Sequence, residues 1–330
     1  MDVITRRRGL LRRRTIVAAA AALTMSAGLA ACGGGSDSSS ASGEGTSVKV
    51  GVIPIIDVAP IYLGIKKGFF KDEGLNLKLE TAQGGAAIVP GVVSGQYQFG
   101  FSNTTSLLLA GDKGLKLSAV TAGVSSTGKV GKDFGAVVVP GNSPIKSAKD
   151  LAGKKVAVNT LNNINTTTIN EVVRADGGDP SGIKYVELPF PDIASAVAKG
   201  DVDAGQVVEP FLTIATQRGD RQVASNYAGT DPDLEVGMYF TSQNYAKGNA
   251  KVVEEFTTAM NKSLSYSQSH PAEARAILSD YTDLNPKVQK AVTLPRWSPK
   301  IATESVTKLG ELSVTDGLLK SQPDVDALLP

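Results

Sequence analysis

The sequence predicts an α/β protein of two lobes, each a mostly parallel sheet flanked by helices, followed by a helical C-terminal tail. Two observations support this prediction. Short apolar runs with strand periodicity alternate with helix-like runs from about residue 47 to residue 236, and beyond Thr241 almost every run has helical spacing. Strand–helix alternation of this kind is typical of a sheet that carries helices on both faces.

The first half of the alternation follows a Gly/Ser-rich stretch. The β-branched run SVKVGVIPI predicts a strand, and apolar residues four apart predict a helix over APIYLGIKKGFF. Leucines at every second position of GLNLKLETA predict another strand. A short helix in AAIVPGVVSG, a strand in YQFGFSN, a helix in SLLLAGDKG and a strand in LKLSAVTAG complete this half.

The second half repeats the theme between residues 135 and 236. Strands are predicted in GAVVVP, GKKVAVN, KYVELP and DVDAGQVVEP, and helices in TTINEVVRADG, DIASAVAKG and FLTIATQRG. The tail opens with the long amphipathic run AKVVEEFTTAMNKSLSYSQSH, which His270 and Pro271 close. Three shorter helical runs follow it.

Charge argues against a nucleic-acid partner. The formal net charge is +2, but residues 1–31 carry six Arg and one Asp, a net of +5. The remaining chain therefore carries +2 − 5 = −3. A mildly acidic body cannot attract a duplex by its net charge.

The N-terminus predicts export and lipid anchoring. A basic segment, MDVITRRRGLLRRR, precedes an apolar stretch that is too short for a membrane span, and LAAC follows. LAAC resembles a bacterial lipobox, so we expect a signal peptide over 1–31 and lipidation of Cys32, the only cysteine. A flexible Gly/Ser tether over 32–46 fits this prediction. An ordinary signal peptide with an incidental Cys is the alternative, and Sec and twin-arginine export both stay open.

Ligands of such sheets bind beyond the carboxyl ends of the strands, where connections diverge. The predicted binding loops are therefore the strand exits: Pro54–Asp57, Gln83–Ala86, Ser102–Thr105, Asn159–Thr166, Pro189–Asp192 and Glu209–Phe211.

The most unusual of these loops is NTLNNINTTT, from Asn159 to Thr168. It holds four Asn and four Thr and no charge. Capping of one helix accounts for one or two of these side chains, so the excess favours a ligand surface. We take Asn159, Asn163, Asn165 and Thr166 as candidate contacts. A helix N-terminus could hold an anion here, or the amides could read a neutral solute.

Two further loops belong to the first lobe. Ser102, Asn103 and Thr104 stand between a strand and a helix, as a ligand surface or as a plain cap. Gln83, with the Gly84–Gly85 pair, offers either a turn or a place where backbone approaches a ligand closely.

The charged candidates are Asp57, Asp192 and Glu209. Glu209 has an alternative role as a helix-start carboxylate, and Tyr62 is either an aromatic wall of the site or a core residue. No strand exit carries an Arg that could clamp an anion in a bidentate manner. These observations favour a neutral, zwitterionic or amine-bearing ligand over a simple oxyanion.

Five stretches, in order, carry a family resemblance. They are VGVIPIIDVAPIYLGIKKGFFKDEGLNLKLE, SPIKSAKDLAGKKVAVN, ASAVAKGDVDAGQVVEPF, HPAEARAILSDYTDL and GLLKSQPDVDALL. Over roughly residues 47–330 the chain resembles ABC-transporter solute-binding proteins of the aliphatic sulfonate, nitrate and taurine group, with which the thiamine-pyrimidine-precursor binders share their opening.

The resemblance implies a type II periplasmic-binding-protein fold. Lobe one would comprise residues 46–138 and 240–330, lobe two 139–239, with crossovers near 136–140 and 237–241. It also implies a monomer that closes on a small-molecule ligand and works with ABC permease and ATPase subunits. A sensor or adhesin that uses the same cleft is the alternative.

The inventory of reactive residues argues against an enzyme. Cys32 is assigned to lipidation, and His270, the only histidine, stands far from the strand exits. One His cannot build a multi-His metal site, and no Gly-rich nucleotide motif follows a strand. Relatives in thiamine biosynthesis are enzymes, but we expect this chain to bind rather than convert its ligand, without a metal or cofactor.

Overall fold

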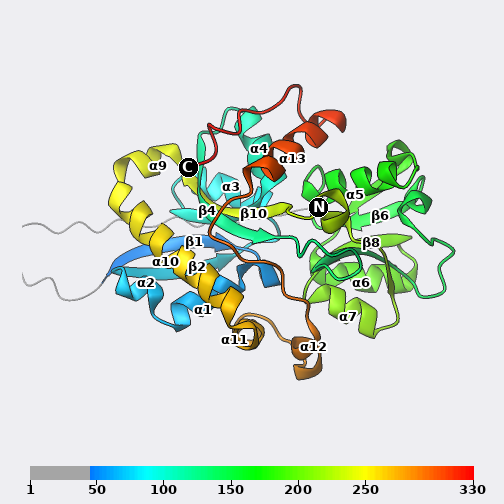
Figure 1. Cartoon of the computed structure of the whole chain (residues 1–330), viewed down its shortest axis with the longest axis horizontal. Coiled ribbons are helices and arrows are strands. Elements are labelled where there is room, and N and C mark those ends of the chain that lie inside the picture. The colour runs from blue at the N-terminus through cyan, green and yellow to red at the C-terminus, as the bar shows by residue number, and fades with distance from the viewer. Residues whose placement is uncertain (1–44) are drawn as a thin grey trace, which may run out of the picture. The chain divides into compact units, whose positions relative to one another are not determined.

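The computed structural model describes residues 45–330, which form two mixed five-stranded sheets flanked by helices. The strand orders are β2-β1-β3-β10-β4 and β7-β6-β8-β5-β9. Figure 1 shows the two sheets and the helices that cover them. The predicted α/β fold with a helical C-terminal region is confirmed. The predictions for the signal peptide and Cys32 fall outside the described residues.

The first sheet is parallel apart from one strand. Its strands are β1 (Thr46–Val52), β2 (Leu75–Thr81), β3 (Phe99–Asn103), β4 (Leu117–Ser125) and β10 (Glu235–Ser242). β10 runs antiparallel between β3 and β4, with Tyr239 opposite Phe101 and Thr121. The chain thus returns from the second half into the middle of the first sheet.

The second sheet has the same organisation. Its strands are β5 (Gly135–Val139), β6 (Lys155–Val158), β7 (Lys184–Glu187), β8 (Ala204–Val208) and β9 (Arg221–Ala224). β6 lies parallel to β7 and β8, and β5 is antiparallel to β8 and β9. All of β5 is buried, as its uninterrupted apolar run GAVVV predicts.

Helices follow most strands, as the alternation predicts. One predicted helix is divided, because Gly68 adopts a left-handed conformation (φ 80°) between α1 and α2. The helices are α1 (Ala59–Lys66), α2 (Phe69–Asp72), α3 (Gly85–Val93), α4 (Thr104–Asp112), α5 (Ile164–Ala175), α6 (Phe190–Lys199), α7 (Phe211–Gln217), α8 (Asn226–Thr230), α9 (Gln243–Gly248), α10 (Ala250–Ser269), α11 (Pro271–Ala276), α12 (Pro286–Ala291) and α13 (Thr303–Thr315).

The chain crosses between the sheets twice, through residues 126–134 and 225–234. These two segments are called the first and second connections below. The expected crossovers near 136–140 and 237–241 are wrong in position, because those residues pair along β5 and β10, each within one sheet. The lobe limits of 46–138 with 240–330, and 139–239, stay a proposal.

Asp133 joins the two connections. Its buried carboxylate accepts hydrogen bonds from the Ser126 hydroxyl (2.6 Å) and the Thr127 amide (2.9 Å) of the first connection. It also accepts one from the Ala228 amide (3.0 Å) of the second. A satisfied buried carboxylate is a strong local constraint, so the two connections are held side by side.

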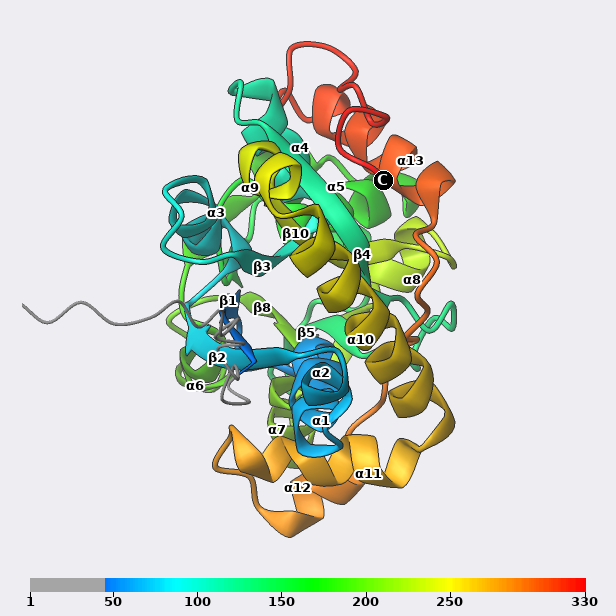
Figure 2. The same cartoon turned by 90° about the vertical axis from the view of Figure 1, so that its left-hand side faces the viewer.

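The tail closes the first sheet. In α10 the ring of Phe256 stacks on Phe99 of β3, with centroids 3.9 Å apart, and Figure 2 shows α10 crossing this side of the molecule. Among the helices of residues 45–330, none combines the length and apolar character needed to span a bilayer.

Candidate functional site

A small cavity lies where strand exits of the two sheets face each other. Its volume is about 20 Å³, room for roughly one water molecule. We call it the inner cavity. The first sheet and its helices contribute Ile53, Ile55, Asp57, Phe101, Asn103 and Val236; the second contributes Asn159, Asn163, Ile164, Asn165, Phe190 and Val208, with Tyr227 from the second connection.

The asparagine-rich loop forms the start of α5. Asn163 is the N-cap: its side chain accepts from the Asn165 amide at 3.0 Å, and the Thr166 hydroxyl accepts from the Asn163 amide at 3.1 Å. Asn162 adopts a positive φ of 51°, which Asn tolerates better than most residues. Capping thus accounts for part of the polar cluster.

The remaining amides bind one another. The Oδ1 atom of Asn159 accepts from the side-chain amides of Asn163 (3.2 Å) and Asn165 (2.8 Å). The hydroxyl of Tyr227 donates to Oδ1 of Asn165 at 2.6 Å. All four side chains are buried, so this network is a fixed polar wall of the inner cavity.

Asp57 faces this wall from the first sheet. It follows β1 in a short 3-10 helix, Ile56–Val58, and is 3% exposed. Its Oδ1 atom has no hydrogen-bond partner. Burial, with a smaller contribution from the charge of Asp133, raises the pKa of Asp57 to about 7.

The Ser102–Thr104 loop serves partly as a helix cap and partly as a wall of the inner cavity. Asn103 caps α4 by accepting from the Ser106 amide at 2.9 Å, and it also lines the inner cavity. The Thr104 hydroxyl donates to the carbonyl of Glu235 at 2.6 Å, which ties α4 to β10. Ser102 is fully buried and does not line the cavity.

Gly84 and Gly85 stand where neighbouring side chains approach the backbone too closely for a Cβ atom. A Cβ atom on Gly85 would stand 2.1 Å from the Ser102 hydroxyl, and one on Gly84 would stand 2.6 Å from the Thr160 hydroxyl. Gln83 itself is exposed, and its carbonyl lies 3.5 Å from the Asn159 side-chain nitrogen. This loop of the first sheet therefore touches the polar loop of the second.

Three other candidates lie away from the inner cavity. The Glu209 carboxylate accepts from the amide and hydroxyl of Thr213 and from the amide of Thr293, at 2.8 to 3.0 Å, and burial raises its pKa to about 7. Asp192 is exposed in the first turn of α6. Tyr62 stacks on Tyr281, with ring centroids 4.0 Å apart.

A larger, apolar hollow of about 230 Å³ adjoins the inner cavity. Ile53, Ile55 and Phe190 line both, and Phe211 and Gln83 line the second alone. We call it the outer hollow. The rings of Phe190 and Phe211 are nearly parallel, 8° apart, with centroids at 6.1 Å. Flat apolar walls of this kind suit a ring or a hydrocarbon chain.

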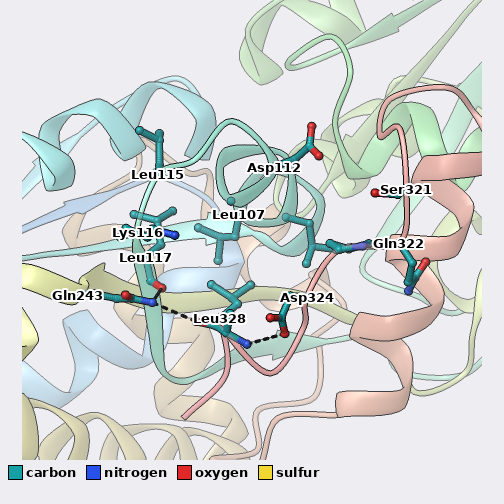
Figure 3. Close-up of a pocket in the computed structure, with 14 residues that line it drawn as sticks. Leu107, Asp112, Leu115, Lys116, Leu117, Gln243, Ser321, Gln322, Asp324 and Leu328 are labelled. Atoms are coloured by element: carbon teal, nitrogen blue, oxygen red, sulfur yellow. Dashed lines mark hydrogen bonds between the residues drawn. The ribbon is translucent and has the colours of Figure 1, made fainter.

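Two further hollows lie outside the cleft. One, of about 320 Å³, separates the end of α4 from the C-terminal segment (Figure 3). There the Gln243 amide already donates to the carbonyls of Leu117 and Ala327. The other, of about 500 Å³, contains Arg296, which pairs with Asp233 at 2.7 Å. Their main polar groups thus hold the tail in place.

Some cavity residues have weak sequence signals. Tyr227 lies in a connection that no periodicity marks as a strand exit. Phe190 belongs to the predicted Pro189–Asp192 loop, but an apolar ring there is equally typical of core packing, so only the charge of Asp192 marks the loop in the sequence. Within residues 45–330 no group of three or more His, Cys, Asp and Glu could hold a metal ion.

Comparison with known proteins identifies the family. The family model described as "NMT1/THI5 like" matches residues 55–274, which contain all the candidate ligand-binding residues and every residue of the inner cavity except Ile53. The chain belongs to the NMT1/THI5-like family.

Relatives of this NMT1/THI5-like chain include binders and enzymes. It is 24% identical, over 86% of its length and 82% of the relative's, to a candidate aliphatic sulfonates-binding protein of Bacillus subtilis (strain 168). It is also 24% identical, over 69% of its length and 67% of the relative's, to a 4-amino-5-hydroxymethyl-2-methylpyrimidine phosphate synthase of Aspergillus parasiticus.

The fold has close counterparts among solved structures. The alkanesulfonate-binding protein SsuA from Xanthomonas axonopodis pv. citri, bound to MOPS, superposes with a TM-score of 0.74 at 19% identity, over 87% of this chain and 99% of the other. This likeness establishes the periplasmic-binding-protein fold. Together, the relatives support a binding-protein role.

Proposed function

We propose that this NMT1/THI5-like chain is the solute-binding component of an ABC importer. One observation carries the proposal: strand exits of both sheets line one cavity, which contains buried polar groups and a carboxylate with one unpartnered oxygen. A site built from two sheets that two connections join can close on a small ligand. The solute is sulfonate-like, nitrate- or taurine-like, or pyrimidine-like, and the closed protein delivers it to a permease.

The proposal includes a membrane anchor. Removal of residues 1–31 would leave Cys32 as the lipidated N-terminus, with the Gly/Ser tether holding the globular part at the outer face of the membrane. Mass spectrometry of the membrane fraction tests this part. A lipid adduct on Cys32, and release of the Cys32→Ser protein into the medium, would support it; an unmodified thiol would contradict it.

A melting-temperature screen of the mature protein tests solute binding. The panel contains alkanesulfonates, nitrate, taurine, amino acids, amines and pyrimidines. A solute at one hundred times its dissociation constant stabilises the folded state by about 2.7 kcal/mol, which gives a clear shift. No shift with any solute, and no permease or ATPase subunit in pull-downs from membranes, would refute the importer role.

The synthase relatives make enzyme activity a second candidate, and the same samples address it. The single histidine, His270, stacks on Tyr266 between α10 and α11 and does not line the inner cavity. A binding protein returns its solute unchanged, so we expect product analysis after incubation to find only the starting compound. Conversion of the solute would favour the enzyme, and binding without permease capture would favour a sensor.

A further inference from the structure

Among the residues that line the inner cavity, Asp57 is the one that has a buried side-chain oxygen without a hydrogen-bond partner. It is almost fully buried, lines the inner cavity, and has one oxygen with no hydrogen-bond partner. Among residues 45–330, no Lys, Arg or His nitrogen lies within 4.0 Å of it. The fold therefore holds a carboxylate at the cavity without supplying its counter-charge.

The groups around Asp57 are neutral or acidic. Burial is the main cause that raises the pKa of the Tyr227 phenol, and the charge of Asp57 is the second. Burial also raises the pKa values of Tyr239 and Tyr281, where Tyr62 contributes before Asp57 does. The buried hydroxyl of Tyr239 has no hydrogen-bond partner, but Tyr239 does not line the inner cavity. Tyr227 and Tyr281 donate their hydroxyl protons elsewhere, to Asn165 and to the Ile55 carbonyl (3.0 Å). Asp133 adds a second negative charge.

Such an arrangement costs folding free energy. A buried carboxylate is stable when it is paired or fully hydrogen-bonded, and costly when it is neither. Glu209 shows the satisfied form in the same protein, with three donors on its carboxylate. Asp57 has no equivalent set of hydrogen-bond donors, so a bound molecule is the natural source of the missing donor.

The neighbouring surfaces limit the shape of that molecule. The inner cavity has room for a small polar group only, whereas the outer hollow of about 230 Å³ is lined by Ile53, Ile55, Phe190 and Phe211. The two share three lining residues. One ligand can therefore place its head at Asp57 and its apolar body in the outer hollow, against the phenylalanine rings that line it.

We propose that Asp57 determines the specificity of this cleft by pairing with a protonated nitrogen of a small organic solute, whose apolar body fills the outer hollow. The inference rests on the proposed function and narrows it. Where Asp57 is ionised, above its pKa of about 7, it repels a solute that is only an oxyanion, such as nitrate or a simple alkanesulfonate. Amines, zwitterions and protonated nitrogen rings fit.

Calorimetric titration with three matched probes tests the pairing. Benzylamine, benzyl alcohol and benzenesulfonate share a phenyl ring and differ in the charge of the head group. At pH 8 the amine is protonated and Asp57 is ionised, because its pKa is about 7. We expect benzylamine to bind at least about tenfold more tightly than benzyl alcohol, the usual advantage of a buried charged hydrogen bond. Benzenesulfonate should not bind measurably.

Two variants separate pairing from general attraction. Asp57→Asn keeps the shape and removes the charge, and should abolish the preference for benzylamine; Asp57→Ser serves if that protein does not fold. Glu254→Gln removes an exposed carboxylate of α10, away from both hollows, and should leave the preference intact. Equal losses in both variants would contradict the inference.

The probes also distinguish this inference from the proposed function. Benzenesulfonate binding more tightly than benzylamine would overturn the role of Asp57 and leave a solute-binding protein for anions. Failure of all three probes would likewise overturn the inference, since no nitrogen head would be recognised. The wider solute screen and the permease pull-down decide the importer role independently.

Discussion

The hydroxyl of Tyr227 donates a 2.6 Å hydrogen bond to the side-chain carbonyl of Asn165. Tyr227 lies in the second connection and Asn165 in the first turn of α5, so the bond links a segment between the sheets to the polar wall of the inner cavity. The two residues are 2% and 1% exposed.

Replacement of Tyr227 by Phe should therefore destabilise the protein. The change leaves Oδ1 of Asn165 buried without its donor, which costs about 1–3 kcal/mol. Denaturant unfolding measures the loss. Tyr245→Phe is the matched control, because that tyrosine is half-buried in α9 and its hydroxyl makes no hydrogen bond to residues 45–330; its cost should stay below about 0.5 kcal/mol. Equal costs would contradict the interpretation.

Asp57→Asn should stabilise the ligand-free protein in a pH-dependent manner. Burial raises the pKa of Asp57 from 3.8 to about 7 in the folded state. The folded protein thus holds the proton more tightly than the unfolded chain, and stability falls as the pH rises from about 4 to about 7. The resulting penalty is on the order of 4 kcal/mol above pH 7, and the neutral Asn removes it.

Melting temperatures of wild type and Asp57→Asn between pH 4 and pH 8 measure this effect. The difference in melting temperature in favour of Asp57→Asn should be small at pH 4, grow up to pH 7, and then level off. Comparison of the two proteins cancels the contributions of Glu209 and Glu235, whose buried carboxyls also have raised pKa values, about 7 and about 8. A difference that does not vary with pH would contradict the prediction.

Gly85→Ala should be strongly unfavourable, although alanine favours helices. Its Cβ would meet the Ser102 hydroxyl at 2.1 Å and the Ser102 Cα at 2.7 Å, so backbone would have to move. Overpacking of this kind typically costs about 1–3 kcal/mol. Gly111→Ala in α4 meets no atom within 4 Å and should be neutral or stabilising by up to about 1 kcal/mol. In thermal unfolding we expect Gly85→Ala to lower the melting temperature and Gly111→Ala to leave it unchanged or raise it. A similar decrease for both variants would contradict the close approach.

The two roles of Asn163 can be separated by substitution. Asn163→Ala removes the cap of α5 and should cost about 1 kcal/mol of unfolding free energy, whereas Ser caps about as well as Asn. Asn163→Ser still removes the amide that binds Asn159, so it should keep more of the stability than Asn163→Ala while it weakens solute binding. Unfolding and titration of both variants give the comparison; equal stabilities would argue against the cap.

Much of the fold could be predicted from local patterns. Alternating β-branched runs place the strands of both sheets, because strand faces repeat every two residues, and the GAVVV run identifies a fully buried strand. The antiparallel direction of β10 could not be predicted, because it depends on where the second connection delivers the chain. The crossovers lie earlier in the chain than the predicted 136–140 and 237–241, because a strand pattern does not show which sheet the strand joins.

The candidate site could be predicted only in part. Strand exits locate Asp57, Asn103, Asn159, Asn163 and Asn165, and all five line the inner cavity. The same rule selects Glu209 and Asp192, whose side chains lie elsewhere, because it specifies where a residue stands and not which way its side chain turns.

The sequence by itself determined the α/β class, the family resemblance and the absence of an Arg clamp at the strand exits, since each depends on local order or residue type. Only the tertiary structure decided that Asp57 is buried without a partner, that Tyr227 completes the polar wall, and that the glycine pair marks a contact between the two halves. Burial and pairing are properties of residues distant in the chain, so they exist only once both sheets are in place.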